Sequence, residues 1–357
     1  MACDTLAVKV LTVVGARPQF IKAAPVSRVL RRQHEEFLVH TGQHYDDEMS
    51  DLFFRQLHIP APDKNLEVGS GRHGVQTGAM LPGIESIALE QKPDWLLVYG
   101  DTNSTLAGAL VGAKLHIPVA HVEAGLRSYD RRMPEEVNRV VADHLAALLL
   151  CPTDTAVENL AREGIAEGVH MVGDVMLDAF HQNLEVARKT CRVVAELGLE
   201  KNGYTLLTVH RAENVDEPAL LAGILRGVGE SGRRVVFPVH PRTRAAFAAT
   251  GMTPPENVML IDPVGYLEML VLEENAEAIV TDSGGLQREA YFAGRPCITL
   301  RDRTEWTETV DAGWNVLVGT EATAIARAMR DFRPRGPRPD LFGDGHAAER
   351  VVEALST

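Results

Sequence analysis

The sequence predicts an α/β fold made of two doubly wound, Rossmann-like halves, each built on a parallel sheet. The chain has 357 residues, which is too long for one average hydrophobic core. Short apolar runs rich in β-branched residues alternate with longer amphipathic segments, a pattern typical of parallel strands joined by crossover helices. This alternation restarts near Val172, which indicates a second domain of similar size.

The first half contains five predicted strands and two well-marked helices. A turn and a helix follow the first strand at 16–33, and a helix with small residues on its packing face follows the third strand at 102–116. The strands are expected at 8–15, 37–42, 94–100, 117–125 and 146–153.

The second half repeats the pattern, with a passage between the domains at 173–199. The expected domains are 1–172 and 173–343, with a closing helix at 344–357 that packs back on the first domain. Strands are expected at 205–211, 234–241, 257–263, 276–285 and 296–301.

Polar clusters stand at the end of almost every predicted strand. Ligands of doubly wound sheets bind beyond the carboxyl ends of the strands. A simpler reading is that loops are polar, but these loops are rich in Arg, His and Glu instead of Ser, Gly and Lys. We therefore expect an active site in the cleft between the two halves.

Composition excludes several classes of function. The formal net charge of -13 argues against a nucleic-acid partner, although a locally basic cleft can still hold a polyanionic ligand. No apolar run approaches about 18 residues, so no membrane span or secretory signal is predicted and a cytoplasmic location is expected. The four cysteines form no CxxC pair, which predicts neither a zinc site nor a disulfide framework.

The segment TDSGGLQREA predicts an anion site. Ser283, Gly284 and Gly285 come directly before a helix, where backbone N–H groups can bind a phosphate. Glu289 could then accept hydrogen bonds from a ribose diol. The alternatives are that Ser283 only caps the helix and that Glu289 is a solvated helix residue.

The segment GARPQFIK follows the first strand but lacks the spacing of a dinucleotide or ATP-binding loop, so neither NAD nor ATP is expected. Arg17 and Lys22 could reach a phosphate from this position. The alternative for Lys22 is the end of a surface helix.

Carboxylates gather on successive strand ends of the first half: Asp101, Glu123, Glu135 and Glu136. Grouped carboxylates repel one another unless they are paired or used for acid/base chemistry. The alternative is a network of ion pairs with nearby arginines, namely Arg127, Arg131, Arg132 and Arg139.

Basic residues gather on the strand ends of the second half: His210, Arg211, His240, Arg242 and Arg244. No helix carries two histidines at i, i+4, and no HExxH zinc motif is present, so neither a metal nor another cofactor is expected. The absence of GxSxG and of a nucleophilic cysteine context argues against acyl transfer.

Taken together, these motifs resemble the non-hydrolysing UDP-N-acetylglucosamine 2-epimerase family. The resemblance covers almost the whole chain, and it depends on the order and spacing of many motifs. They are GARPQFIK, TGQHYD, GDTNSTLAGA, HVEAGLRS, PEEVNR, VHRAEN, PVHPRT, DPVGYLEM, TDSGGLQREA, RDRTEW and GDGHAAERV.

The resemblance implies a GT-B architecture and a homodimer. It implies that UDP lies mainly against the second domain and that the sugar faces the first. The implied catalytic residues are Asp101, Glu123, Glu135 and His210. The implied substrate-binding residues are Arg17, Lys22, His44, Arg211, His240, Arg242, Tyr266, Ser283, Gly284, Gly285, Glu289 and Arg301.

The resemblance also implies elimination of UDP to a 2-acetamidoglucal, followed by re-addition. Family members that use UDP-N-acetylglucosamine commonly read GTRPE, HRRE, VHLNP and TERPE where this chain reads GARPQ, HRAEN, VHPRT and TEWTE. These differences resemble the branch that acts on UDP-2,3-diacetamido-2,3-dideoxyglucuronate. An additional guanidinium group at Arg242 or Arg244 would suit a sugar carboxylate, and the alternative is that both arginines face solvent. UDP-N-acetylglucosamine remains the other candidate substrate. Rival functions are a GT-B glycosyltransferase, a hydrolysing 2-epimerase and a non-catalytic nucleotide-sugar sensor.

Overall fold

The computed structural model describes residues 7–43 and 60–356, and the chain forms two compact units. Unit 1 contains the chain up to Ala179 and again from Phe342, and unit 2 is the continuous segment Phe180–Leu341. Each unit has a parallel sheet and its own hydrophobic core.

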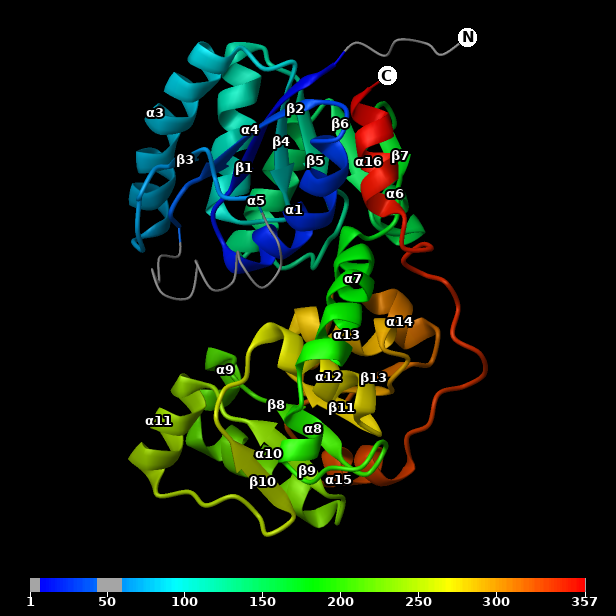
Figure 1. The fold of residues 1–357 in the computed structure, drawn as a ribbon. Helices are drawn as coiled ribbons and strands as arrows, with labels where there is room; N and C mark the ends of the chain where they lie inside the picture. Colours follow the sequence, from blue (N-terminus) through cyan, green and yellow to red (C-terminus); the bar gives the residue numbers. More distant parts are fainter. Residues whose placement is uncertain (1–6, 44–59, 357) are drawn as a thin grey trace. The chain divides into compact units, whose positions relative to one another are not determined.

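Unit 1 is built on a seven-stranded sheet in the order β3-β2-β1-β4-β5-β6-β7 (Figure 1). Strand β1 lies between β2 and β4, so the strand order reverses at β1, and the carboxyl ends of β1 and β4 form the switch point where such sheets bind ligands. Its strands and helices are β1 Lys9–Val14, α1 Arg17–Leu30, β2 Glu35–His40, β3 Lys64–Asn65, α3 His73–Gln91, β4 Trp95–Tyr99, α4 Asn103–Leu115, β5 Val119–Val122, α5 Pro134–Leu145, β6 Leu148–Cys151, α6 Asp154–Arg162, β7 Val169–Met171 and, after unit 2, α16 Ala347–Leu355.

Helix α4 lies close to the sheet because two of its positions are glycine. A Cβ atom at Gly108 would stand 2.7 Å from Val98 Cγ1, and one at Gly112 would stand 2.4 Å from Val119 Cγ2. Both distances are shorter than any real contact, so larger residues would push α4 away from β4 and β5. The small residues predicted on the packing face of this helix are therefore confirmed.

The turn between β1 and α1 is tied to the end of β4 by one glutamine. Gln19 Oε1 accepts hydrogen bonds from Gly15 N at 2.8 Å and Ala16 N at 3.1 Å, and its Nε2 donates to Tyr99 O at 2.8 Å. Gln19 is buried, so these bonds are shielded from water. The side chain thus fixes the two loops that meet at the switch point of unit 1.

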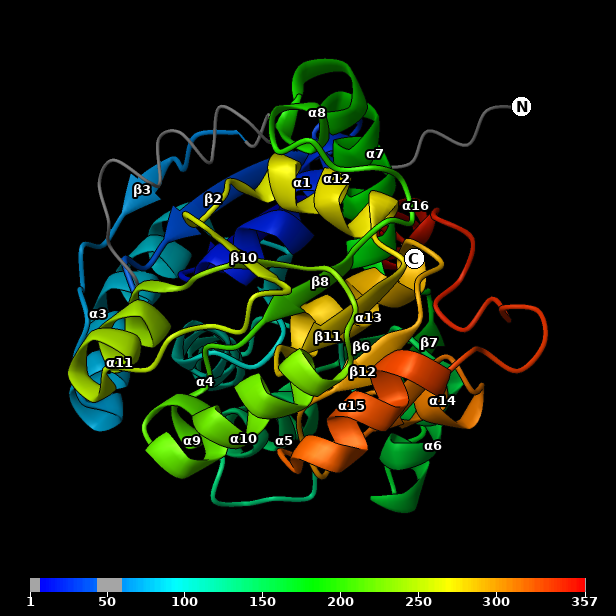
Figure 2. The same ribbon diagram turned by 90° about the horizontal axis from the view of Figure 1, so that it is seen from below.

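Unit 2 repeats the doubly wound plan with a six-stranded parallel sheet in the order β10-β9-β8-β11-β12-β13. Its switch point lies between β8 and β11, and Figure 2 shows α10 beside α15 on this unit. Its strands and helices are α8 Val193–Glu196, β8 Thr205–Thr208, α9 Ala212–Val215, α10 Pro218–Glu230, β9 Val235–Pro238, α11 Pro241–Thr250, β10 Val258–Ile261, α12 Tyr266–Asn275, β11 Ala278–Thr281, α13 Gly284–Phe292, β12 Cys297–Thr299, α14 Thr307–Asp311, β13 Asn315–Leu317 and α15 Ala322–Asp331.

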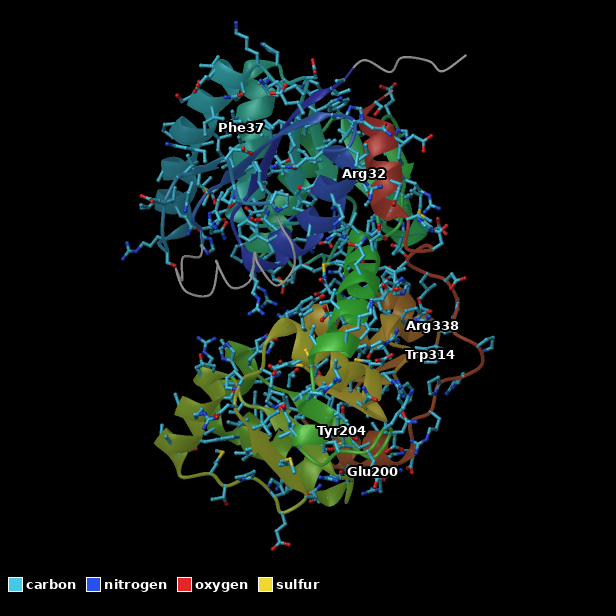
Figure 3. The ribbon with its side chains drawn as sticks, viewed as in Figure 1. Arg32, Phe37, Glu200, Tyr204, Trp314 and Arg338 are labelled. Atoms are coloured by element: carbon cyan, nitrogen blue, oxygen red, sulfur yellow. The ribbon has the colours of Figure 1, made fainter. Side chains whose placement is uncertain are left out.

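Three large side chains of unit 2, Tyr204, Trp314 and Arg338, join elements that are distant in the sequence (Figure 3). The buried Tyr204 donates from its hydroxyl to Leu272 O at 2.6 Å. Trp314 packs edge-on against Tyr291, with 6.1 Å between ring centroids, and the Arg338 guanidinium lies 5.5 Å from the same Tyr291 ring. These contacts join β8 to α12, and the segment after α15 to α13.

The chain crosses from unit 1 to unit 2 within helix α7, Val175–Thr190, and returns to form α16 against α1. Asp178 of α7 accepts hydrogen bonds from Ala347 N at 3.2 Å and Ala348 N at 2.7 Å. A carboxylate at these N–H groups caps α16 and is favoured by the helix dipole. Burial nevertheless raises the pKa of Asp178 to about 6.

All ten predicted strands are present, and the described part of the chain adds three that the sequence did not predict. These are β3, β7 and β13, which have two or three residues each and lie at sheet edges. Strands this short contain too few residues to show a period of two. None of the described helices is long and apolar enough to span a bilayer.

Candidate functional site

A buried ion pair joins two loops at the carboxyl edge of the unit 1 sheet. Lys22 Nζ of α1 lies 2.5 Å from Glu123 Oε1, directly after β5, and both side chains are 7% exposed. The Glu123 backbone has φ of +71°, a left-handed conformation that is uncommon for a residue with a side chain. The reading of Lys22 as the end of a surface helix is wrong, because its ammonium group is buried against Glu123.

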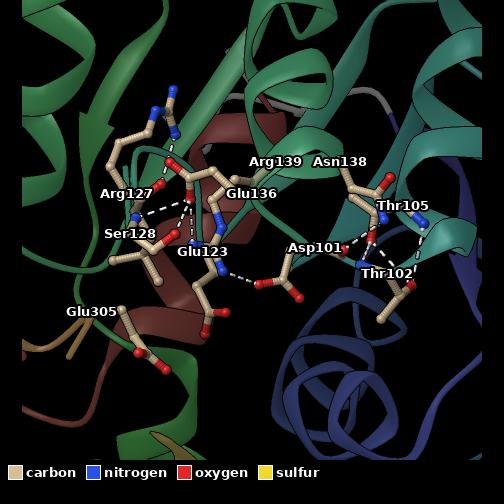
Figure 4. Close-up of polar contacts among 12 residues, drawn as sticks. Asp101, Thr102, Thr105, Glu123, Arg127, Ser128, Glu136, Asn138, Arg139 and Glu305 are labelled. Carbon is tan, nitrogen blue, oxygen red and sulfur yellow. Dashed lines mark hydrogen bonds and ion pairs between the residues drawn. The ribbon is translucent and has the colours of Figure 1, made fainter. Parts of the chain in front are cut away.

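A second group of charges surrounds Asp101, which follows β4 (Figure 4). Arg139 of α5 donates to Asp101 Oδ2 and, at 2.9 Å, to Glu136 Oε2. Glu136 also accepts from Ser128 N, Ser128 Oγ and Tyr129 N, each at 2.9 Å. Although burial opposes ionisation, these bonds and the charge of Arg139 lower the pKa of Glu136. Glu136 is therefore a fixed carboxylate that holds Arg139 against Asp101.

Glu135, which the sequence placed among the catalytic carboxylates, is exposed in the first turn of α5, whereas Glu136 is buried. Asp101 is also held through its backbone, because Asn138 Nδ2 donates to Asp101 O at 3.0 Å. Of the predicted arginine network, Arg139 pairs with Asp101 and Glu136, whereas Glu123 pairs with Lys22.

Beneath these loops lies a buried group that the sequence analysis did not single out. His121 of β5 bonds through Nδ1 to Asp143 Oδ1 and through Nε2 to Gly100 O, both at 2.7 Å. Carboxylate and carbonyl oxygens only accept hydrogen bonds, so each ring nitrogen of His121 faces an acceptor. Burial opposes ionisation of Asp143, but His121 and Arg127 lower the pKa of Asp143.

This group connects the loops that follow β4 and β5. His121 holds Gly100, which precedes Asp101, and Asp143 Oδ2 accepts from Gly125 N at 3.1 Å, close after Glu123. The signal in the sequence was a histidine within an otherwise apolar strand, VAHV. Its partner Asp143 could not be identified, because it lies on a helix far along the chain.

At the switch point of unit 2, Asp282 ties the end of β11 to the end of β8. Its carboxylate accepts hydrogen bonds from His210 N and Arg211 N, each at 3.0 Å, and from Asn214 Nδ2 at 3.1 Å. Arg211 Nε in turn donates to Asp282 O at 2.9 Å. This arrangement fixes the guanidinium group of Arg211 beside the start of α13.

His210 and His240 lie close together, with 5.6 Å between ring centroids. Burial lowers the pKa of His210; Asp282 opposes this, and the charges of His240, Arg211 and Arg242 lower it further. His240 also caps α11 by accepting a hydrogen bond from Arg242 N at 3.2 Å.

The start of helix α13 has the geometry of an anion site. Ser283 caps the helix by accepting from Leu286 N at 3.3 Å, which confirms its capping role. Gly284 and Gly285 follow, and their N–H groups make no hydrogen bond within the described residues. Because such orphan groups carry the positive end of the helix dipole, they can bind an anion.

Glu289 and Tyr266 meet behind this helix start. Tyr266 Oη donates to Glu289 Oε1 at 3.1 Å, and both residues are 8% exposed. Burial, followed by the charge of Glu289, raises the pKa of Tyr266, so the phenol stays protonated and able to donate. The reading of Glu289 as a solvated residue is wrong.

Arg242 and Arg244 lie on the surface of unit 2. Arg242 Nε stands 3.5 Å from Asp216 Oδ1, and Arg244 Nη2 stands 2.7 Å from Asp262 Oδ1. Arg17 is exposed at the start of α1, whereas Arg301 is buried. His44 lies outside the described residues.

Glu273 of α12 is buried in unit 2, where the charge of Glu289 acts on it. It is 0% exposed, and neither carboxyl oxygen has a hydrogen-bond partner among residues 7–43 and 60–356. Burial, together with the charge of Glu289, raises the pKa of Glu273 well above 4.5. The folded protein therefore binds a proton that the unfolded chain releases above pH 4.5, and stability falls as the pH rises above that value.

We accordingly expect Glu273→Gln to be more stable than the unmodified protein at pH 8 and nearly equal to it at pH 4.5. The difference should grow by up to about 1.4 kcal/mol per pH unit until Glu273 ionises in the folded state. Hydrogen exchange of β11 amides across this pH range measures the difference. The exposed Glu256→Gln is the control, and an equal pH dependence in both variants would contradict the explanation.

The part of the chain that the structure describes contains no group of three His, Cys, Asp or Glu side chains suited to a metal ion. The charged groups described in each unit are arginine, lysine, carboxylate and helix N–H groups at the carboxyl edge of its sheet. Such groups bind anions and transfer protons.

Comparisons with known proteins agree with this chemistry. A family profile described as UDP-N-acetylglucosamine 2-epimerase matches residues 28–356. A UDP-N-acetylglucosamine 2-epimerase homolog from Methanococcus maripaludis is 52% identical over 97% of this chain and 99% of its own length. UDP-2,3-diacetamido-2,3-dideoxy-D-glucuronate 2-epimerase from Pseudomonas aeruginosa is 47% identical over 98% of this chain and 99% of its own length.

Among solved structures, UDP-GlcNAc 2-epimerase from Methanocaldococcus jannaschii in complex with UDP-GlcNAc and UDP is similar with a TM-score of 0.88 and 45% identity. The match covers 97% of this chain and 99% of that one, and with the two parallel sheets it confirms the GT-B type of fold. The chain belongs to the UDP-N-acetylglucosamine 2-epimerase family, and it is an isomerase that acts on carbohydrates.

Proposed function

We propose that this protein inverts carbon 2 of a UDP-linked N-acetylamino sugar without net hydrolysis. The observation that carries the proposal is a set of carboxylates, one buried and one partly buried, each paired with a cation at the carboxyl edge of the unit 1 sheet. Glu123 is paired with Lys22, and Asp101 with Arg139. Carboxylates at this place can accept a proton, which is what chemistry at a C–H bond requires.

The residues of unit 2 suit the nucleotide. The N–H groups of Gly284 and Gly285, with the guanidinium groups of Arg211 and Arg301, offer positive charge to a diphosphate. Glu289 is proposed to bind the ribose, and the loop before α12 to present backbone groups to uracil near Tyr266. The UDP and UDP-GlcNAc named in the Methanocaldococcus jannaschii complex support a UDP-sugar as ligand.

The proposed reaction is an elimination followed by re-addition. The C2 proton is not next to a carbonyl, so its removal alone would leave an unstabilised carbanion. If the C1–O bond breaks at the same time, its electron pair leaves with UDP and a C1=C2 double bond forms in 2-acetamidoglucal. A proton returned to the other face of C2, with renewed attack of the UDP oxygen at C1, gives the epimer. Asp101 and Glu123 are proposed to move the protons, with Glu135 and His210 as further candidates.

For the sugar, we propose UDP-2,3-diacetamido-2,3-dideoxyglucuronate, with UDP-N-acetylglucosamine as the second candidate. The relative from Pseudomonas aeruginosa carries the first sugar in its name, and the one from Methanocaldococcus jannaschii the second. Arg242 and Arg244 favour the first, because a guanidinium group pairs bidentately with a carboxylate. In the structure Arg242 and Arg244 pair with exposed aspartates. Such surface ion pairs contribute only about 0–1 kcal/mol each, so a sugar carboxylate could replace the aspartates at little loss of free energy.

Incubation with each of the two UDP-sugars in deuterium oxide, followed by proton NMR, tests the function and the substrate together. We expect deuterium at C2 of both epimers and a larger kcat/KM for the diacetamidoglucuronate. Product that keeps its original C2 hydrogen would exclude elimination, and equal kcat/KM values would exclude the carboxylate preference. Released free sugar would indicate a hydrolysing enzyme, transfer to an added acceptor a glycosyltransferase, and binding without turnover a sensor.

A further inference from the structure

At the start of helix α13, a carboxylate of the protein lies against the first glycine of the helix and beside Arg211 and Arg301. A Cβ atom built on Gly284 would stand 2.1 Å from Glu305 Oε1 and 3.9 Å from Arg211 Nη2. The Glu305 carboxylate therefore lies against the backbone of Gly284. Its side chain is only 16% exposed.

Two arginines hold this carboxylate in its charged form. Arg301 Nη1 donates to Glu305 Oε2 at 3.0 Å, and the Arg301 side chain is 7% exposed. Although burial opposes ionisation, the charges of Arg301 and Arg211 and the backbone N–H of Glu305 lower its pKa. These arginines are the ones that suit a diphosphate, so Glu305 occupies the surroundings that an anionic ligand would need.

The backbone on both sides of Glu305 is anchored to α13. Thr304 Oγ1 donates to Gln287 Oε1 at 2.6 Å and accepts from Trp306 N at 3.1 Å. The Trp306 ring is buried, with the Arg288 guanidinium 4.5 Å from its centroid. Because Thr304 and Trp306 are fixed, the backbone of Glu305 is held in place. Rotation of the Glu305 side chain is therefore the way in which its carboxylate can leave Gly284.

We propose that Glu305 is a specificity-determining residue that competes with the diphosphate of the substrate for the start of α13. This inference rests on the proposed function, because it takes the ligand to be a nucleoside diphosphate. In the unliganded protein the Glu305 carboxylate neutralises Arg211 and Arg301. A diphosphate, which carries more charge, displaces it and binds the same groups. Glu305 occupies this place in a fraction of the molecules. The apparent affinity for UDP falls in proportion to the fraction in which the place is free.

Titration calorimetry with three probes tests the proposal: UDP, inorganic pyrophosphate and uridine. Glu305→Gln keeps the shape of the side chain and removes its charge, and Glu305→Ala removes the group altogether. For both variants we expect about tenfold tighter binding of UDP and of pyrophosphate, if Glu305 occupies the start of α13 in about nine-tenths of the unliganded molecules. Uridine affinity should not change, because uridine carries no phosphate.

Glu213→Gln is the matched control. Glu213 Oε1 lies 4.0 Å from Arg211 Nη1 and 3.9 Å from Arg301 Nε, but its side chain is 63% exposed. Removal of this charge should change UDP affinity less than twofold. Unchanged or weaker UDP binding in the Glu305 variants would overturn the proposal, and so would an equal gain for uridine. Failure of the unmodified protein to bind UDP would instead contradict the proposed function.

Discussion

Glu123→Gln is expected to lower kcat by a factor of about 100 to 10,000, the usual contribution of a general base. Glutamine has the shape of glutamate and can still accept a hydrogen bond from Lys22, so the loop after β5 should keep its conformation. It cannot take up a proton from C2. UDP affinity should stay within about twofold, because the proposed nucleotide-binding groups belong to unit 2.

Turnover measured by NMR and UDP affinity measured by calorimetry separate these two effects. Glu158→Gln is the control, since Glu158 forms a surface pair with Arg162 in which both side chains are 64% exposed. A Glu123→Gln enzyme with kcat within threefold of the unmodified protein would exclude Glu123 as the base for C2.

Lys22→Met is expected to destabilise unit 1 by about 3–5 kcal/mol, because it leaves the buried Glu123 carboxylate without its cation. Methionine has nearly the same length as lysine, so the loss reflects charge and not an empty space. Adding Glu123→Gln to Lys22→Met should restore much of the stability, since no uncompensated charge then remains buried. Hydrogen exchange of the β1 and β5 amides reports the stability of unit 1.

The surface pair between Lys9 and Glu35 provides the comparison. Its atoms are 3.0 Å apart, but the side chains are 27% and 65% exposed, so Lys9→Met should cost less than about 1 kcal/mol. Two results would contradict this role of the Lys22–Glu123 pair. One is a loss of stability in Lys22→Met no larger than that in Lys9→Met. The other is a double variant that is no more stable than Lys22→Met alone.

Much of the fold could be predicted from the sequence because parallel sheets consist of buried strands with continuous apolar runs. The ten predicted strands have such runs, and polar residues follow them. Strands β3, β7 and β13 could not be predicted, because their few residues become strands only by pairing with a longer neighbour.

For the candidate site, the residue types could be predicted but their partners could not. The sequence singled out Glu123, Lys22 and Asp101, yet it could not show that Lys22 is buried against Glu123. Glu135 and Glu136 are adjacent in the sequence, and only the orientation of α5 makes one exposed and the other buried. Contacts between distant elements decide such cases, and a local pattern does not contain them.

The return of the chain to unit 1 also has a consequence for the order of folding on the ribosome. Domains usually fold as they emerge, beginning with the one nearest the N-terminus. Here α16, which Asp178 caps and which packs against α1, is translated only after all of unit 2. Unit 2 is continuous and can complete its core while unit 1 still lacks this helix. The later-synthesised unit is therefore the first that can be finished during translation, and the docking of α16 completes the earlier one.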